Sequence, residues 1–271
     1  MLFDFEVDAW SEEKGFHKVS VKAMRTAVPG RAVQFTSGYG SFVARAHPTP
    51  AKARALFAAG HRHVLLQVDF QGSELPQRTP AQIAAETAVA HAAGLAVDWW
   101  MWVRPRDRMG AGRRPGGVEA MHRRLVELQT AGLQPPPLFV ADCEVDGGWD
   151  RTRPALAQVA GAARTAGMSR VGLSTHAFVG ARWPVSAFDV GLPQLYRKLP
   201  VTPEWALRML KSWRGCKEFW PTLGCADDSD AAEMAADVAA LDTLGCYGAT
   251  WWTARQLNGA KLAASVPGGR P

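Results

Sequence analysis

Apolar and polar positions follow a repeated order along the chain. Five segments rich in small and polar residues end in a glycine, and an apolar run begins within a few residues of each glycine. A glycine in this position is typical of a helix end, where a left-handed residue closes the last turn. The glycines are Gly60, Gly94, Gly132, Gly167 and Gly245. The order of helix, glycine and strand predicts consecutive βα units.

Apolar runs predict the strands themselves. Five runs follow the glycines, at residues 64–69, 96–103, 138–144, 171–175 and 247–252. Further strands near residues 2–7, 189–196 and 218–220 bring the total to about eight. Residues 10–48 are long for a simple connection, so Arg31–Thr36 is an alternative first strand.

The helices between these runs have recognisable starts and faces. Threonine precedes proline at residues 49–50, 79–80 and 202–203, where the hydroxyl suits the cap and the proline suits the first turn. Apolar residues recur at helical spacing in two later segments, which predicts one buried stripe on each helix. The stripes are Val118, Met121, Leu125 and Leu128, and Met234, Val238 and Leu241.

The number and order of these elements predict an α/β fold, a (β/α)₈ barrel of the TIM type, rather than an open doubly wound sheet. No glycine-rich phosphate fingerprint follows the first strand, which counts against a dinucleotide site. We expect one barrel domain over residues 1–257, irregular in its first quarter, and a C-terminal tail over residues 258–271. In such a barrel the functional residues lie at the carboxyl ends of the strands.

Charge and composition narrow the class of partner. The net charge of +6 favours an anionic partner, which includes nucleic acid, a membrane surface and an anionic cell-wall polymer. The densest basic stretch, Arg104–Arg114, is interrupted by proline and glycine, so it predicts a loop. A nucleic-acid binder is therefore the lowest-ranked hypothesis for the function. The sequence has no run of about 18 apolar residues and no basic, apolar leader. We therefore expect no membrane span and no signal peptide. The protein would then be made in the cytoplasm and would reach a wall only after lysis, or through a phage or a secretion machine.

Cysteine and histidine positions argue against a metal or a cofactor. The four cysteines form no CxxC pair, and strand alternation turns Cys143 away from its acidic neighbours. His61 and His63 form an HxH pattern, but they lie at the start of a strand, the end that serves stability in a barrel. We expect a structural or surface histidine pair, no catalytic metal and no cofactor.

Two carboxyl groups follow the apolar run Leu138–Val140. Asp142 and Glu144 leave one face of the strand with Cβ atoms roughly 6.5–7 Å apart. Two carboxyl groups on one face shift each other's pKa values, which is how a hydrolase places an acid beside a base. The alternative is a solvated strand end whose carboxylates cap a helix or pair with arginine.

Polar and aromatic residues at other strand ends extend this candidate site. The chain has 11 tryptophans but only 3 tyrosines, and the group at Trp99, Trp100, Trp102, Trp220, Trp251 and Trp252 favours a cleft for sugar rings. For any one of these rings taken alone, core packing is the better interpretation. The predicted substrate-binding residues are Asp69, Asp98, Trp100, Trp102, Gln194, Tyr196 and Trp251. The acidic pair Asp227 and Asp228 also follows a strand.

Three motifs together resemble family 25 glycoside hydrolases, the Chalaropsis-type lysozymes. They are Asp142-Cys143-Glu144 after the fourth strand, Phe3-Asp4-Phe5 near the start, and Ala92-Ala93-Gly94-Leu95 before an aromatic third strand. The resemblance implies that Glu144 is the proton donor, that Asp142 stabilises the transition state or orients an acetamido group, and that Asp4 completes the set. The tryptophans at residues 99–102 and 251–252 depart from the family pattern. This departure indicates a remodelled site or a related barrel family found in phage and bacterial genomes.

The resemblance implies a muramidase that hydrolyses peptidoglycan or another β-linked amino-sugar polymer and acts as a bacteriolytic phage lysin. The alternative from another class is a barrel that binds glycan without hydrolysis, such as a component of a phage tail or an injection machine.

Overall fold

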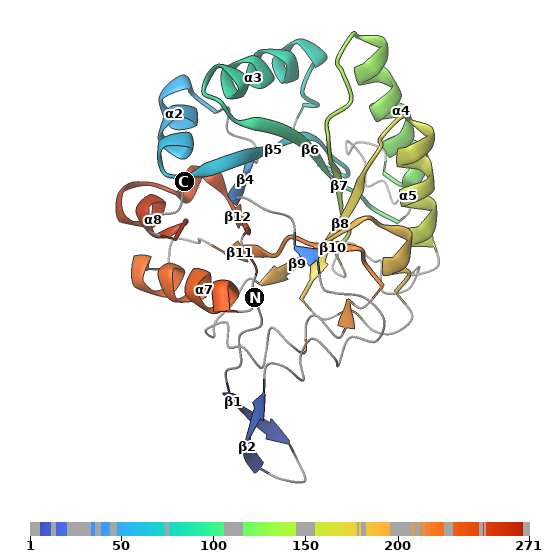
Figure 1. Cartoon of the computed structure of the whole chain (residues 1–271). Helices are drawn as coiled ribbons and strands as arrows, with labels where there is room; N and C mark the ends of the chain where they lie inside the picture. Colours follow the sequence, from blue (N-terminus) through green and yellow to red (C-terminus); the bar gives the residue numbers. More distant parts are fainter. Residues whose placement is uncertain are drawn as a thin grey trace.

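Eight parallel strands form a closed barrel with helices on its outside, as Figure 1 shows. The (β/α)₈ prediction is therefore confirmed. This computed structural model describes residues 6–11, 15–20, 34–35, 39–43, 48–73, 76–105, 116–144, 155–177, 179, 183–195, 208, 212–213, 215–224, 230–243, 246 and 248–267.

The strands follow one another around the barrel in chain order. They are β4 (Tyr39–Val43), β5 (His61–Phe70), β6 (Ala96–Trp102), β7 (Phe139–Asp142), β8 (Val171–His176), β9 (Val190–Leu195), β10 (Glu218–Phe219) with β11 (Thr222–Gly224), and β12 (Thr250–Trp252). The pieces β10 and β11 pair with successive parts of β9 and together make the seventh strand. The barrel closes where β12 pairs with β4.

Helices follow the strands around the outside of the barrel where the structure describes them. They are α2 (Pro50–Ala58), α3 (Pro80–Ala92), α4 (Val118–Thr130), α5 (Leu156–Thr165), α7 (Ala231–Thr243) and α8 (Gly259–Ala264), with short 3₁₀ turns η4 (Val185–Ala187) and η5 (Ala254–Gln256). Thr49 caps α2, and Thr79 forms a reciprocal capping box with Gln82 on α3. Gly60, Gly94, Gly132 and Gly167 all have positive φ. The predicted cap at residues 202–203 and Gly245 lie outside the described residues.

The amino-terminal prediction is wrong. Strands β1 (Glu6–Ser11) and β2 (Gly15–Ser20) form an antiparallel sheet of their own, apart from the barrel in Figure 1. Within 31–36, only β3 (Gln34–Phe35) is a strand, and it pairs with β10. The first barrel strand is β4, which pairs with β12 and β5. Its sequence, Tyr-Gly-Ser-Phe-Val, is short and interrupted by glycine and serine, so its apolar pattern is weak.

Two apolar layers hold the barrel together. The inner layer fills the barrel with Phe42, Leu65, Trp100, Leu138, Val140, Val190, Leu192 and Trp220. The outer layer lies between strands and helices and includes both predicted helical stripes as well as Cys143. Cys143 thus faces away from its acidic neighbours, as predicted, and burial raises the pKa of its thiol well above the usual range.

The carboxyl-terminal prediction of a tail also differs from the structure. Helix α8 follows Asn258, and Ser265 and Val266 are buried directly after it. Trp251 donates its indole N–H to the Ser265 carbonyl at 2.8 Å. Residues 259–266 therefore belong to the barrel's outer layer.

Ser265 also explains how the buried His61 side chain is hydrogen-bonded. The Ser265 hydroxyl donates to the Leu262 carbonyl, so it accepts a hydrogen bond from Nε2 of His61 at 2.7 Å. Nδ1 of His61 then accepts from Ser41 at 2.9 Å, and burial lowers the pKa of this histidine to about 3. His63 has a different partner, Asp98, at 3.1 Å. The two histidines have separate structural contacts at the amino ends of the strands, as predicted.

Across the residues that are described, no helix is long and apolar enough to cross a membrane.

Candidate active site

Asp142 and Glu144 lie at the carboxyl end of β7, where the sequence places them. Asp142 is the last residue of the strand and is 3% exposed, whereas Glu144 is half-buried. Ser174 is the register partner of Asp142 on β8 and is also buried. Gln194 reaches the same place from β9, one strand further around the barrel. Three consecutive strands thus contribute polar side chains to one cluster.

The Gln194 amide group joins the two carboxyl groups. Its Nε2 atom lies 2.8 Å from Oδ1 of Asp142, 3.2 Å from Oε1 of Glu144 and 3.1 Å from Oγ of Ser174. Since the two carboxyl oxygens contact one nitrogen atom, they lie no more than about 6 Å apart. The sequence predicts both Gln194 and the pair, and the structure brings them together.

Burial and charge separate the two carboxyl groups chemically. Desolvation raises the pKa of Asp142 well above its usual range, and the nearby Glu144 raises it further. Hydrogen bonds from Ser174 and Gln194 oppose this rise without cancelling it. Asp142 is therefore the more buried carboxyl group, with a raised pKa, and Glu144 is the more accessible one.

Two half-buried tryptophans lie at other strand ends of the barrel. Trp102 ends β6 as the register partner of Asp142, and it is half-buried. Its indole packs against Phe70 with ring centroids 4.3 Å apart. Trp252 ends β12, also half-buried, and contacts Trp100 and Phe42 inside the barrel. Asp69 lies one residue before the end of β5 and is 8% exposed.

Three predicted substrate-binding residues lie elsewhere. Asp98 is near the start of β6, where it accepts a hydrogen bond from the Leu138 backbone and contacts His63. Trp100 is fully buried in the inner layer, and Trp251 is fully buried in the outer layer. Because neighbouring strand residues face opposite sides, a run of tryptophans cannot all line one cleft. Trp99 and Trp220 are likewise core residues, so only Trp102 and Trp252 of the predicted group remain at the strand ends.

Asp4, Tyr196, Asp227 and Asp228 lie outside the described residues. The first barrel strand, β4, contains no carboxyl group. Ser174 was missed, although its position after an apolar run on the next predicted strand is a usable signal. Among the described residues, no group of three or more histidine, cysteine or acidic side chains could hold a metal ion.

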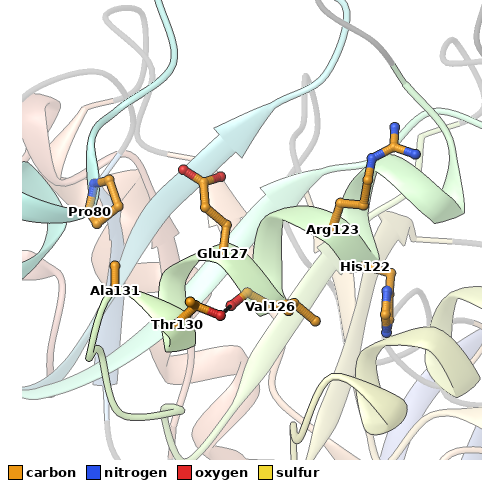
Figure 2. Close-up of a pocket in the computed structure, with 7 residues that line it drawn as sticks. All are labelled: Pro80, His122, Arg123, Val126, Glu127, Thr130 and Ala131. Carbon is orange, nitrogen blue, oxygen red and sulfur yellow. Dashed lines mark hydrogen bonds between the residues drawn. The ribbon is translucent and has the colours of Figure 1, made fainter.

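A hollow in the surface, shown in Figure 2, lies away from this cluster. Pro80 at the start of α3 borders one side, and residues of α4 and its end form the rest. Its lining residues are Pro80, His122, Arg123, Val126, Glu127, Thr130 and Ala131. All of them belong to the outer helices, so this hollow is distinct from the strand ends.

Comparison with known proteins identifies solved structures that have a similar fold. No protein-family model and no curated protein matches the sequence. An endoglucanase from Pseudomonas stutzeri has a similar structure, with a TM-score of 0.58, 15% identity, and coverage of 81% of this chain and 86% of the endoglucanase. A chitinase from Chromobacterium violaceum also has a TM-score of 0.58, with 11% identity and coverage of 85% of this chain and 98% of the chitinase.

A protein described as a putative aldo-keto reductase from Pseudomonas aeruginosa matches at a TM-score of 0.50 and 15% identity, over 87% of this chain and 91% of its own. At such identities these likenesses show the barrel fold, which many unrelated activities share. They do not single out family 25, so membership of that family stays a hypothesis.

Proposed function

We propose that this protein is a glycoside hydrolase that cleaves a β-linked amino-sugar polymer, with peptidoglycan as its substrate and Glu144 as the general acid. The observation that carries this proposal is the Asp142, Gln194 and Glu144 cluster at the carboxyl ends of β7 and β9. Two carboxyl groups held close together in different environments are the arrangement that acid catalysis of glycoside cleavage requires.

Glu144 takes the acid role because its side chain is the more exposed of the two. It would protonate the glycosidic oxygen as the bond breaks. Asp142 is buried and its pKa is raised, so it is a poor nucleophile. With Gln194 it would orient the acetamido group of the substrate, whose carbonyl oxygen then attacks the anomeric carbon.

The separation of the carboxyl groups supports this route. Inverting glycosidases hold their two carboxyl groups roughly 6.5–9.5 Å apart to admit a water molecule. The Asp142 and Glu144 oxygens that share Gln194 lie closer than that. We therefore propose net retention of configuration, through assistance by the substrate.

Three further observations support the substrate class. The Asp142-Cys143-Glu144 motif resembles family 25 lysozymes, which act on amino-sugar polymers. The endoglucanase and the chitinase share the barrel fold and cleave glycans by name. The half-buried Trp102 and Trp252 provide apolar surface beside the cluster.

Replacement of the acid tests the assignment. Glu144→Gln should lower the rate of peptidoglycan hydrolysis at least about a hundredfold, because the general acid is removed while the side-chain shape is kept. Release of soluble muropeptides from purified walls measures the rate. Glu119→Gln, which removes an exposed carboxylate on α4, is the matched control and should keep full activity. Full lytic activity in Glu144→Gln contradicts the assignment.

A second candidate is a barrel that binds glycan without cleaving it, as in a phage or injection machine. The absence of a carboxyl group from β4 favours this candidate, since the family 25 resemblance assigns a third acid to the first strand. Mass spectrometry of peptidoglycan after incubation separates the two. New reducing ends support hydrolysis, whereas co-sedimentation with walls and no new ends supports binding alone.

A further inference from the structure

The Arg104 side chain is held in a fixed place beside the candidate active site. Its guanidinium carbon lies 5.0 Å from the centre of the Trp102 ring. On another side it packs against Gly72, which has a φ of +72°. A Cβ atom at Gly72 would lie 2.9 Å from the Arg104 Cζ and Nε atoms, so only glycine admits the guanidinium here.

A buried glutamine fixes the backbone of Arg104. Gln71 is fully buried, and its Oε1 atom accepts the N–H groups of Arg104 and Gly117, each at 2.8 Å. Its Nε2 atom donates to the Gly117 carbonyl at 3.0 Å. The Gln71 amide group therefore holds both ends of the segment that connects β6 to α4. A freely solvated arginine would not need its backbone to be held in this way.

The charge of Arg104 has no partner within the described part of the chain. Among the described residues, no carboxylate lies within ion-pair distance of its guanidinium, and its Nε atom is buried without a hydrogen bond. A partly desolvated cation without a counter-ion is unfavourable for the free protein. An arginine on an aromatic face is suited to bind a carboxylate through two parallel hydrogen bonds.

Arg104 lies on a strand end next to the one that holds Asp142 and Glu144. Trp102 is the register partner of Asp142, and the Val103 N–H donates to the Asp142 carbonyl at 2.9 Å. Arg104 therefore follows β6 by two residues, as Glu144 follows the neighbouring β7 by two residues. Both side chains leave adjacent strand ends at the same rim of the barrel.

We propose that Arg104, supported by Gly72, Trp102 and Gln71, is a subsite for a carboxylate carried by a pyranose unit of the substrate. The subsite makes the enzyme selective for acidic glycans over neutral ones. This inference rests on the proposed function. It requires that the substrate has a sugar with a lactyl or uronic carboxylate beside the bond that is cleaved.

Binding to the Glu144→Gln protein tests the subsite without requiring catalysis. Calorimetry would compare an alternating N-acetylglucosamine and N-acetylmuramic acid tetrasaccharide with the same compound after amidation of its lactyl carboxylates. We expect amidation to weaken binding roughly ten- to a hundredfold, as for the loss of a charged hydrogen-bonded pair. The affinity for a hyaluronan tetrasaccharide, which carries uronic carboxylates, shows whether the subsite fits a uronic or a lactyl carboxylate.

Variants of Arg104 test whether this residue causes the preference for the carboxylate form. In the same background, Arg104→Gln should reduce the preference for the carboxylate form to less than about threefold, and Arg104→Lys should retain part of it. Arg123→Gln removes one positive charge from the exposed surface of α4 and should leave the preference unchanged. Thermal unfolding of each variant reports on folding.

Equal affinity for the acidic and amidated forms, or a full preference in a folded Arg104→Gln variant, overturns the subsite. These outcomes are distinct from failure of the proposed function, which is an absence of hydrolysis by the protein with Glu144 intact.

Discussion

A carboxyl group that is enclosed by protein and faces a second carboxyl group keeps its proton to a higher pH than an exposed one does. Asp142 is such a group, since burial and Glu144 both raise its pKa. Ser174 and Gln194 donate hydrogen bonds to it, which lowers the cost of ionisation but leaves the pKa raised. The protonation state of the site is thus determined by contacts between three strands, and it changes when any of them is altered.

The raised pKa gives a pH-dependent stability. In the pH range above about 4, the unfolded chain releases the Asp142 proton while the folded protein retains it. Stability from this group is therefore complete below about pH 4 and is lost as pH rises through the folded pKa. Asp142→Asn cannot ionise, so its melting temperature relative to the wild type should increase from pH 4 upward. Thermal unfolding across a pH series measures this difference, and a constant difference contradicts the raised pKa.

Strand alternation predicts that Asp142 and Glu144 share a face and that Cys143 does not, and it requires only their positions in the sequence. Ser174, Gln71 and Arg104 could not be found in this way, because their roles depend on partners 20 to 46 residues away. Alternation also shows why Trp100 and Trp251 do not lie at the rim. Their strand positions turn the rings into the two cores instead of the rim.

A β-bulge shapes the end of β5, where the register with β6 shifts between Gln67 and Asp69. Two arginines bind the carbonyl groups at this irregular point. Arg78 donates to the Gln67 carbonyl at 2.6 Å, and buried Arg124 donates to the Val68 carbonyl through Nε and Nη2, both at 3.2 Å. The bulge places Asp69 near the barrel rim, so these arginines support the geometry of the site from the outer layer.

Loss of one arginine should weaken the bulge. Arg124→Met leaves buried carbonyl groups without donors and should lower the free energy of unfolding by about 2–4 kcal/mol. Arg123→Met, one residue earlier and exposed, should change it by less than about 0.5 kcal/mol. Urea unfolding measures both variants. Similar small changes in the two proteins would show that Arg124 does not support the bulge.

Helices were predicted more reliably than strands. Threonine caps, closing glycines and apolar stripes are local signals, and α2, α3 and α4 follow them. The first strand, β4, has no comparable signal, because glycine at residue 40 is required for contact with Trp220 and not for a turn. Its identity depends on closure of the whole barrel.

The two ends of the barrel domain are joined through His61. This residue of β5 binds Ser41 of β4 and Ser265 beyond α8, and all three are fully buried. Ser265→Ala removes the acceptor for His61 Nε2 and should cost about 1–3 kcal/mol in a denaturant titration. Ala263→Ser, on the exposed side of α8, is the matched control. An unchanged free energy of unfolding in Ser265→Ala would show that this contact does not secure the domain.

Closure of the barrel by its last strand and helix affects the order in which the protein can mature on the ribosome. Residues 39–195 supply Asp142, Ser174 and Gln194, but their sheet has two open edges, at β4 and β9. Strands β10 and β11 cover the edge of β9, and the barrel closes only when β12 emerges and pairs with β4. At about 5–20 residues per second, synthesis of the remaining segment to residue 267 takes roughly 4–15 s. During that interval the nascent chain exposes unpaired strands, which makes it a substrate for chaperones and excludes activity before synthesis is nearly complete.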